Sequence, residues 1–68
     1  MDIQEGSVVR TKIDIPYGPY RPGIAVPRGA LGTVKKVNPA FLHVEWCVEG
    51  QTGTTTRNVS ASEVEFVN

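Results

Sequence analysis

The residues with the richest chemistry in this 68-residue chain are its one histidine and its one cysteine, His43 and Cys47. An imidazole and a thiolate together can bind a metal ion or form a nucleophile–base pair. The two residues lie four positions apart in an alternation typical of a β-strand, which separates them by roughly 13 Å. That span is too long for the two side chains to share one metal ion, because each ligand lies about 2 Å from zinc. It is also too long for a catalytic pair, because a nucleophile must reach its base through a hydrogen bond. We therefore predict no metal site, unless an interface between two copies creates one.

The carboxylates and glycines show no catalytic pattern either. No pair among Glu45, Glu49, Glu63 and Glu65 has a spacing that suggests acid–base work. Glu63 instead completes the capping-box pattern Ser-x-x-Glu that starts at Ser60. The run GALGTV, residues 29–34, lacks the lysine and the following helix of a phosphate-binding loop. We predict that the chain is not an enzyme, has no catalytic residues and carries no cofactor.

The most distinctive segment is Asp14 to Gly29, DIPYGPYRPGIAVPRG, which holds four of the five prolines and both tyrosines. Proline recurs at every third residue from position 16 to position 22, which matches the three-residue turn of polyproline II. In that conformation Tyr17 and Tyr20 line one edge of a stiff arm. The arm would resist pairing with a sheet because proline has no backbone N–H.

A first function for this loop is to bind a partner. Tyr17, Tyr20 and Arg21 would supply the contacts, since tyrosine gives a large contact area at low entropy cost. Trp46 or Phe41 would complete an aromatic groove on the surface of the domain.

Two other functions for the loop stay open. The loop could itself be a ligand, because Pro16-x-x-Pro19-x-Arg21 matches a motif that proline-recognising domains bind. Alternatively it could cover one mouth of a barrel. In that case the apolar residues Ile15, Ile24 and Val26 would plug the open end, and the tyrosines would be half-buried packing.

The charges are unevenly divided along the chain, although the formal net charge is zero. Residues 1–37 carry six basic and three acidic side chains, a balance of +3, and residues 38–68 carry one basic and four acidic side chains, a balance of −3. The charges could mix over one solvated surface, or the basic half could steer an acidic partner. Its candidate contacts, besides Arg21, are Arg10, Lys12, Arg28, Lys35 and Lys36. Zero net charge disfavours binding to nucleic acid, which normally needs a basic excess.

The elements that position these residues are predicted to be short β-strands, because Val, Thr and Ile are frequent and Gly and Pro punctuate the chain. The clearest strand is 42–48, where apolar Val44 and Trp46 alternate with polar neighbours. We also expect strands at 7–13, 31–37, 54–59 and 64–67, and a single 3₁₀ turn at 60–63. This order predicts one all-β domain of residues 1–68. It would be a small five-stranded SH3-like barrel with a long loop after the first strand and few open sheet edges.

Four stretches resemble the skeleton of known SH3-like proteins: EGSVVR (5–10), ALGTVKKV (30–37), HVEW (43–46) and NVSASEVEFV (58–67). The photosystem I reaction-centre subunit IV family and the variable chain of ferredoxin–thioredoxin reductase share this layout. In both families the barrel docks on a larger redox complex and carries no cofactor, so the resemblance implies an accessory, protein-binding role. KOW-type barrels share the first two stretches, which implies the alternative of nucleic-acid or ribosome binding through the basic half.

The end of the chain, TTTRNVSASEVEFVN (54–68), is similar in layout to the plasmid-borne type II dihydrofolate reductases. Those enzymes are tetramers of a comparable barrel around one central pore, which is lined by a Val-Gln-Ile-Tyr stretch. The corresponding residues here are Thr55 to Asn58, and the glutamine, isoleucine and tyrosine are missing. A pore enzyme is therefore the least favoured alternative.

The cellular setting follows from size and composition. Cys47 is the only cysteine, so the chain has no internal disulfide, and a reducing compartment is expected. The chain shows neither a signal-peptide pattern nor an apolar run of about 18 residues, so we predict a cytoplasmic protein that does not enter membranes. So small a domain is only marginally stable by itself, which favours a protein partner or a homo-oligomer.

Overall fold

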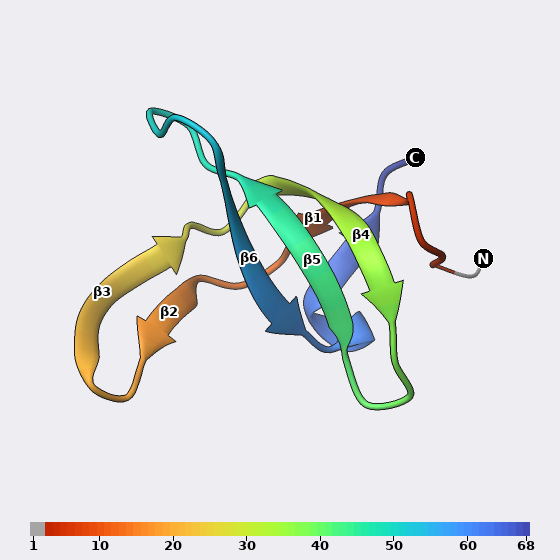
Figure 1. Cartoon of the computed structure of the whole chain (residues 1–68), viewed down its shortest axis with the longest axis horizontal. Coiled ribbons are helices and arrows are strands. Elements are labelled where there is room, and N and C mark those ends of the chain that lie inside the picture. Colours follow the sequence, from red (N-terminus) through yellow and green to blue (C-terminus); the bar gives the residue numbers. More distant parts are fainter. Residues whose placement is uncertain (1–2) are drawn as a thin grey trace.

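A computed structural model describes residues 3–68 and is all-β, with two antiparallel sheets (Figure 1). The larger sheet has the strand order β6-β5-β4-β1-β7. Its strands are β1 (Val8–Thr11), β4 (Leu31–Val37), β5 (Leu42–Cys47), β6 (Thr54–Val59) and β7 (Val64–Phe66). These are the five expected strands. Within residues 3–68, β6 and β7 each pair on one side only, so the sheets do not close into a barrel. The expectation of few open sheet edges was therefore wrong.

The smaller sheet is a hairpin of β2 (Ile15–Gly18) and β3 (Arg21–Val26), in the segment for which we predicted a polyproline II arm that avoids pairing. That prediction was wrong. The register shifts twice, and each shift leaves one extra residue on β3. Proline is tolerated on edge strands and at bulges, and both strands of a two-stranded sheet are edges. Pro16 and Pro22 therefore fit the hairpin without costing the larger sheet any hydrogen bond.

The ends of the hairpin are tied to one another where the chain leaves and rejoins the larger sheet. The Thr11 N–H donates to the Ala30 carbonyl at 3.1 Å, and the Gly29 N–H donates to the Thr11 carbonyl at 2.9 Å. One step further out, the Arg28 N–H donates to Asp14 Oδ1 at 2.8 Å. The segment 12–28 is thus a loop whose two ends are joined by hydrogen bonds at its base.

The core lies on the inner face of the larger sheet, around the fully buried Trp46. The other buried apolar residues are Val9, Ile15, Ala25, Val26, Val34, Leu42, Val44, Val59 and Val64. Gly32 stands opposite Trp46 in the β4–β5 register. A Cβ atom added there would lie 2.5 Å from Trp46 Cε3 and 2.6 Å from Val44 Cγ1. The indole ring therefore packs directly on the Gly32 backbone, a contact that no side chain permits.

Local hydrogen bonds set the end of β1 and the start of the 3₁₀ turn. The Thr11 hydroxyl donates to the Ile13 carbonyl at 2.8 Å and accepts from the Ile13 N–H at 3.2 Å, so β1 stops at Thr11 and Ile13 does not continue its buried face. Before β7, the expected 3₁₀ turn is confirmed at Ala61–Glu63. The Ser60 N–H donates to Glu63 Oε1 at 2.9 Å, as the capping-box pattern predicts.

Candidate functional site

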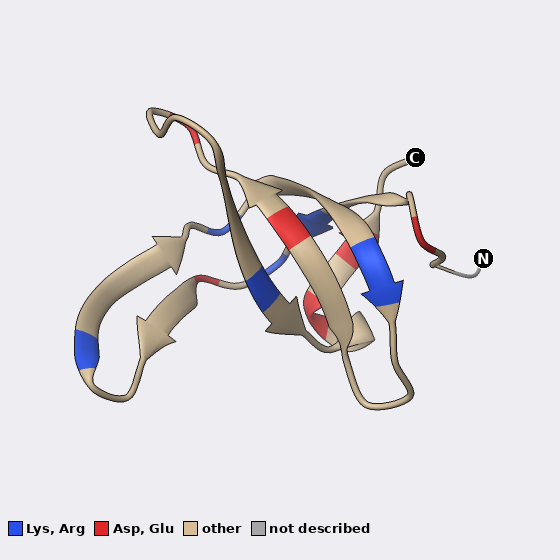
Figure 2. Ribbon diagram, in the orientation of Figure 1, with Lys and Arg blue, Asp and Glu red and all other residues tan. Residues whose placement is uncertain are grey.

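The basic residues of the first half of the chain are distributed over several elements of the fold (Figure 2). Arg10 pairs with Glu65, its register partner on β7, at 3.2 Å between Nη1 and Oε1. Lys35 and Lys36, near the end of β4, lie far from Arg10. Leu31 is the register partner of Arg10, and Lys36 is five positions further along β4, a distance of about 16 Å. Lys12 and Arg28 flank the base of the hairpin. Glu65, from the acidic half of the sequence, lies against Arg10, so an acidic side chain of the second half is placed among the basic residues of the first half.

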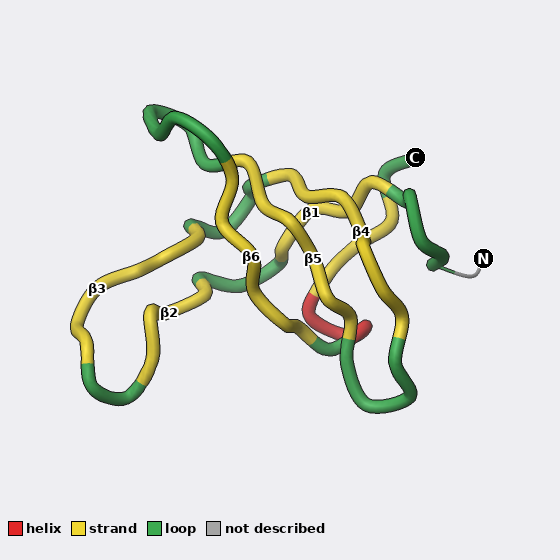
Figure 3. Tube along the Cα trace, viewed as in Figure 1, coloured by secondary structure: helices red, strands yellow, loops and turns green. Residues whose placement is uncertain are grey.

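The hairpin has a buried base and an exposed tip. Ile15, Ala25 and Val26 are in the core, whereas Ile24 is 48% exposed. Burial of Ile15 and Val26 agrees with the expected plug, and Ile24 departs from it. Both strands run up to a short turn at residues 19–20, which stands clear of the larger sheet (Figure 3).

Tyr17 is half-buried, lies two residues before the hairpin turn and packs against the core. The Arg21 guanidinium carbon lies 4.0 Å from the centroid of its ring, which is a cation–π contact between β2 and β3. The ring also covers Gly23, where an added Cβ would lie 3.5 Å from Tyr17 Cε2. Tyr17 is therefore fixed in place, and it presents the stacked Arg21 toward solvent.

Tyr20 occupies the hairpin turn and is 98% exposed. The two tyrosines thus do not share one edge, because Tyr17 is packed and Tyr20 is free. The predicted groove with Trp46 is wrong, since that ring is fully buried. Phe41, 38% exposed, belongs to the β4–β5 connection, which Figure 1 shows well apart from the hairpin turn.

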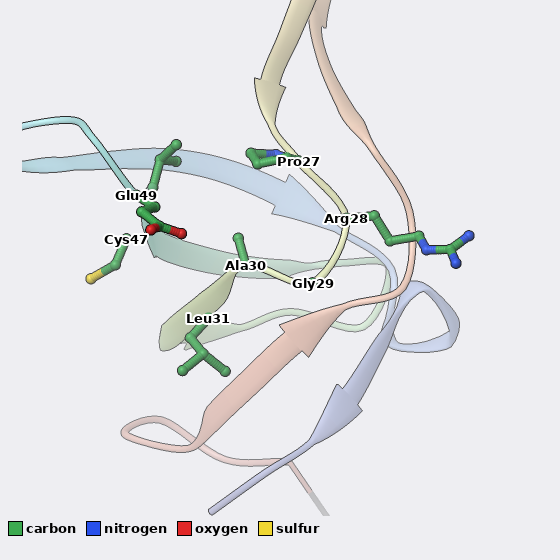
Figure 4. A pocket seen from close by; sticks show the side chains of 8 residues that line it. Pro27, Arg28, Gly29, Ala30, Leu31, Cys47 and Glu49 are labelled. Carbon is green, nitrogen blue, oxygen red and sulfur yellow. The ribbon is translucent and has the colours of Figure 1, made fainter.

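A shallow groove of about 480 Å³ lies between the β3–β4 connection and the end of β5 (Figure 4). Its lining residues are Pro27, Arg28, Gly29, Ala30, Leu31, Cys47, Val48 and Glu49. Leu31 and Cys47 are register partners and both are exposed. The Arg28 side chain points away from the other side chains (Figure 4), so this predicted contact residue borders the groove without projecting into it. The groove was not predicted from the sequence, because the pairing of positions 31 and 47 becomes apparent only once the strand register is known.

The two residues with metal-binding or nucleophilic chemistry are separate on the outer face of β5. His43 Nδ1 lies 2.8 Å from Asn58 Oδ1, and Cys47 is a free, exposed thiol. Among residues 3–68, no group of three or more His, Cys, Asp or Glu side chains is placed to hold a metal ion. The same residues form no helix with the length and apolar character needed to cross a membrane. Comparison of the chain with protein-family models, with curated proteins and with solved structures gives no match.

Proposed function

We propose that this chain is a non-catalytic, SH3-like protein-binding domain that acts as an accessory module or small subunit of a larger complex. Its binding element is the tip of the β2–β3 hairpin, with Tyr20 as the anchor and Arg21, held by Tyr17, beside it. The proposal assigns no catalytic step and no cofactor to the chain.

The observation that carries the proposal is the exposure of Tyr20. A tyrosine that is 98% exposed contributes almost nothing to folding, yet it offers a large aromatic surface to another molecule. Tyrosine and arginine, together with tryptophan, are the side chains enriched at the energetic centres of protein interfaces. At this tip they are adjacent in the sequence, and Ile24 adds a half-exposed apolar side chain on the same strand as Arg21.

The hairpin also supports the proposal through its rigidity. Its base belongs to the core, and the Arg21–Tyr17 contact joins its two strands near the tip. Proline at position 19 fixes the backbone angle φ of the first turn residue. A pre-ordered contact surface loses less conformational entropy on binding, so even a small one can give useful affinity.

The SH3-like assignment is supported by the order of the elements. The chain forms a first strand and then a long hairpin segment. Three consecutive antiparallel strands, one 3₁₀ turn and a last strand follow. The last strand pairs with the first, and the first pairs with β4. This order of elements supports the proposal, although the open edges of β6 and β7 depart from a closed barrel.

Photo-crosslinking from position 20 tests the function directly. Tyr20 is replaced by a photoreactive phenylalanine analogue, the protein is irradiated in lysate of its source cells, and the products are identified by mass spectrometry. We expect one protein complex that is also lost when Tyr20→Ala is used as bait in a pull-down. Phe41→Ala is the matched control, because it removes an exposed aromatic ring from a different turn and should leave capture unchanged.

The same experiment can contradict the proposal. Equal loss of capture in Tyr20→Ala and Phe41→Ala would show that binding is not specific to the hairpin. Recovery of RNA with ribosomal proteins, weakening steeply with salt, would favour the nucleic-acid alternative instead.

A further inference from the structure

β6 is an edge strand of the larger sheet and is open on the side away from β5. It pairs with β5 along its whole length, from Thr54 to Val59. Within residues 3–68, the only other hydrogen bond made by a main-chain atom of β6 joins the Thr56 carbonyl to Arg57 Nη1 at 2.8 Å. The edge therefore consists of about six residues, roughly 20 Å, of extended backbone with one side chain laid against it.

The strand registers show that the main chain of Thr56 faces this open side. The Val8 N–H donates to the Asn68 carbonyl at 2.7 Å, on the side of β7 and away from β4. Thr33, Glu45 and Thr56 follow Val8 across the sheet as successive register partners. Two register partners in an antiparallel ladder face either toward each other or away from each other. Thr33 and Glu45 therefore face each other, and the main chain of Thr56 points away from β5.

Arg57 covers the centre of the open side. Because the direction alternates along the strand, Thr54, Thr56 and Asn58 all point their main-chain groups outward, and Thr56 is the middle one of the three. The Arg57 guanidinium donates to the Thr56 carbonyl, in the position that an N–H of an added strand would need. A strand that pairs with β6 across its centre must therefore displace this charged donor first.

The pose of the Arg57 side chain is costly for a residue at a sheet edge. Arg57 Nε is buried and has no hydrogen-bond partner among residues 3–68. A buried charged donor without a partner is unfavourable, and an arginine at an edge can avoid this cost by extending its guanidinium into water. The side chain instead lies back along the strand and reaches the Thr56 carbonyl. Natural proteins accept such losses of stability in features that exclude wrong pairings.

The other sheet edges are protected by different means. β7 is only three residues long and has Glu65 at its centre. The hairpin strands contain Pro16 and Pro22 and two register shifts. Short length, charge, proline and bulges are the usual protections of an exposed edge. β6, with the sequence TTTRNV, has none of them apart from Arg57, and its threonines favour extended pairing.

We infer that Arg57 protects the β6 edge from strand addition. Its guanidinium, laid on the Thr56 carbonyl, keeps extended segments from joining the sheet and so prevents edge-to-edge association of the protein. An extended segment gains access to β6 only when this side chain moves away. The role is separate from the hairpin tip and does not depend on the proposed function.

Removal of the guanidinium tests this role. Arg57→Thr introduces the residue type that already occupies positions 54–56 and favours extended backbone. Lys35→Thr is the matched control, because it removes the same charge from β4, which is paired on both sides and exposes no edge. Association is followed by light scattering and thioflavin T fluorescence, and the emission of the buried Trp46 shows that each variant is folded. We expect Arg57→Thr to associate several-fold faster than Lys35→Thr and the unmodified chain.

Two further variants complete the test. Arg57→Met keeps an apolar stem over the sheet and should also associate faster, so the test does not depend on the folding of one variant. Thr56→Pro, added to either Arg57 variant, removes an N–H that faces the open side and costs no bond with β5. It should return association to the rate of the unmodified chain.

Two results would overturn the inference. In the first, the folded Arg57 variants associate no faster than Lys35→Thr, so the guanidinium protects nothing. In the second, Thr56→Pro leaves the faster association unchanged, so the association arises at a surface other than β6.

Discussion

The structure predicts that the two tyrosines of the hairpin contribute unequally to stability. Tyr17→Ala removes a half-buried ring that packs on the core, contacts Arg21 and covers Gly23. Tyr20→Ala removes a ring that is 98% exposed. The first change should therefore destabilise the fold, and the second should leave it intact while it removes binding.

The magnitude follows from the buried area. A fully buried aromatic side chain removes about 150–250 Å² from water, so a half-buried ring contributes about 2 kcal/mol at roughly 25 cal/mol per Å². The true value is lower, because part of this area is already buried in the unfolded chain. Loss of the partly exposed cation–π contact offsets this by adding about 0.5–1 kcal/mol to the cost. We therefore expect Tyr17→Ala to cost about 2 kcal/mol, or roughly 8–16 °C in the midpoint of so small a domain. Tyr20→Ala should change the stability by less than about 0.5 kcal/mol.

Thermal and urea unfolding can be followed through Trp46, which is the only tryptophan and is fully buried. Tyr17→Phe is the control, because it keeps the ring over Gly23 and beneath Arg21 and should stay close to the unmodified protein. The reasoning is refuted if Tyr20→Ala lowers the midpoint as much as Tyr17→Ala does. In that case the hairpin tip packs on the body, and Tyr20 is not free to anchor a partner.

Two further substitutions test the core and the 3₁₀ turn. Gly32→Ala forces a Cβ into the Trp46 ring and should cost about 1–3 kcal/mol in urea unfolding, and an unchanged midpoint would show that the indole can move aside. Glu63→Ala removes the acceptor of the Ser60 N–H and should cost about 1 kcal/mol, whereas Glu63→Gln keeps an acceptor and should recover most of that loss in the same assay.

The strands of the larger sheet could be predicted from the sequence because their signal is local. The alternation around Trp46 gives a strand and its buried face at once, and both ends of β4 and of β6 agree with the expected ranges 31–37 and 54–59. The single turn before β7 was predictable for the same reason, since a capping box spans only four residues. These features depend on neighbours within a few positions.

The hairpin was mispredicted and the charge distribution stayed open because both depend on pairing between distant positions. Proline at every third residue is typical of polyproline II, and the sequence does not show that two register shifts on β3 accommodate it. Arg10 and Glu65 are 55 residues apart and belong to opposite charge balances, yet they meet because β1 lies between β4 and β7. The sequence singled out Tyr17, Tyr20 and Arg21 as candidate contacts, but it did not show that Tyr17 contacts Arg21 while Tyr20 stays exposed.

The closed ends of the segment 12–28 have a consequence for how the protein can change. Thr11 and Ala30 are hydrogen-bonded across the base, and Ile15, Ala25 and Val26 complete the core beside it, so only the tip of the segment is independent of the larger sheet. Insertions, deletions or a foreign loop are accommodated most easily where the two ends already meet. The hairpin tip can therefore diversify in length and specificity while the sheet stays constant. The same architecture would let an engineer graft a different recognition loop onto this 68-residue scaffold.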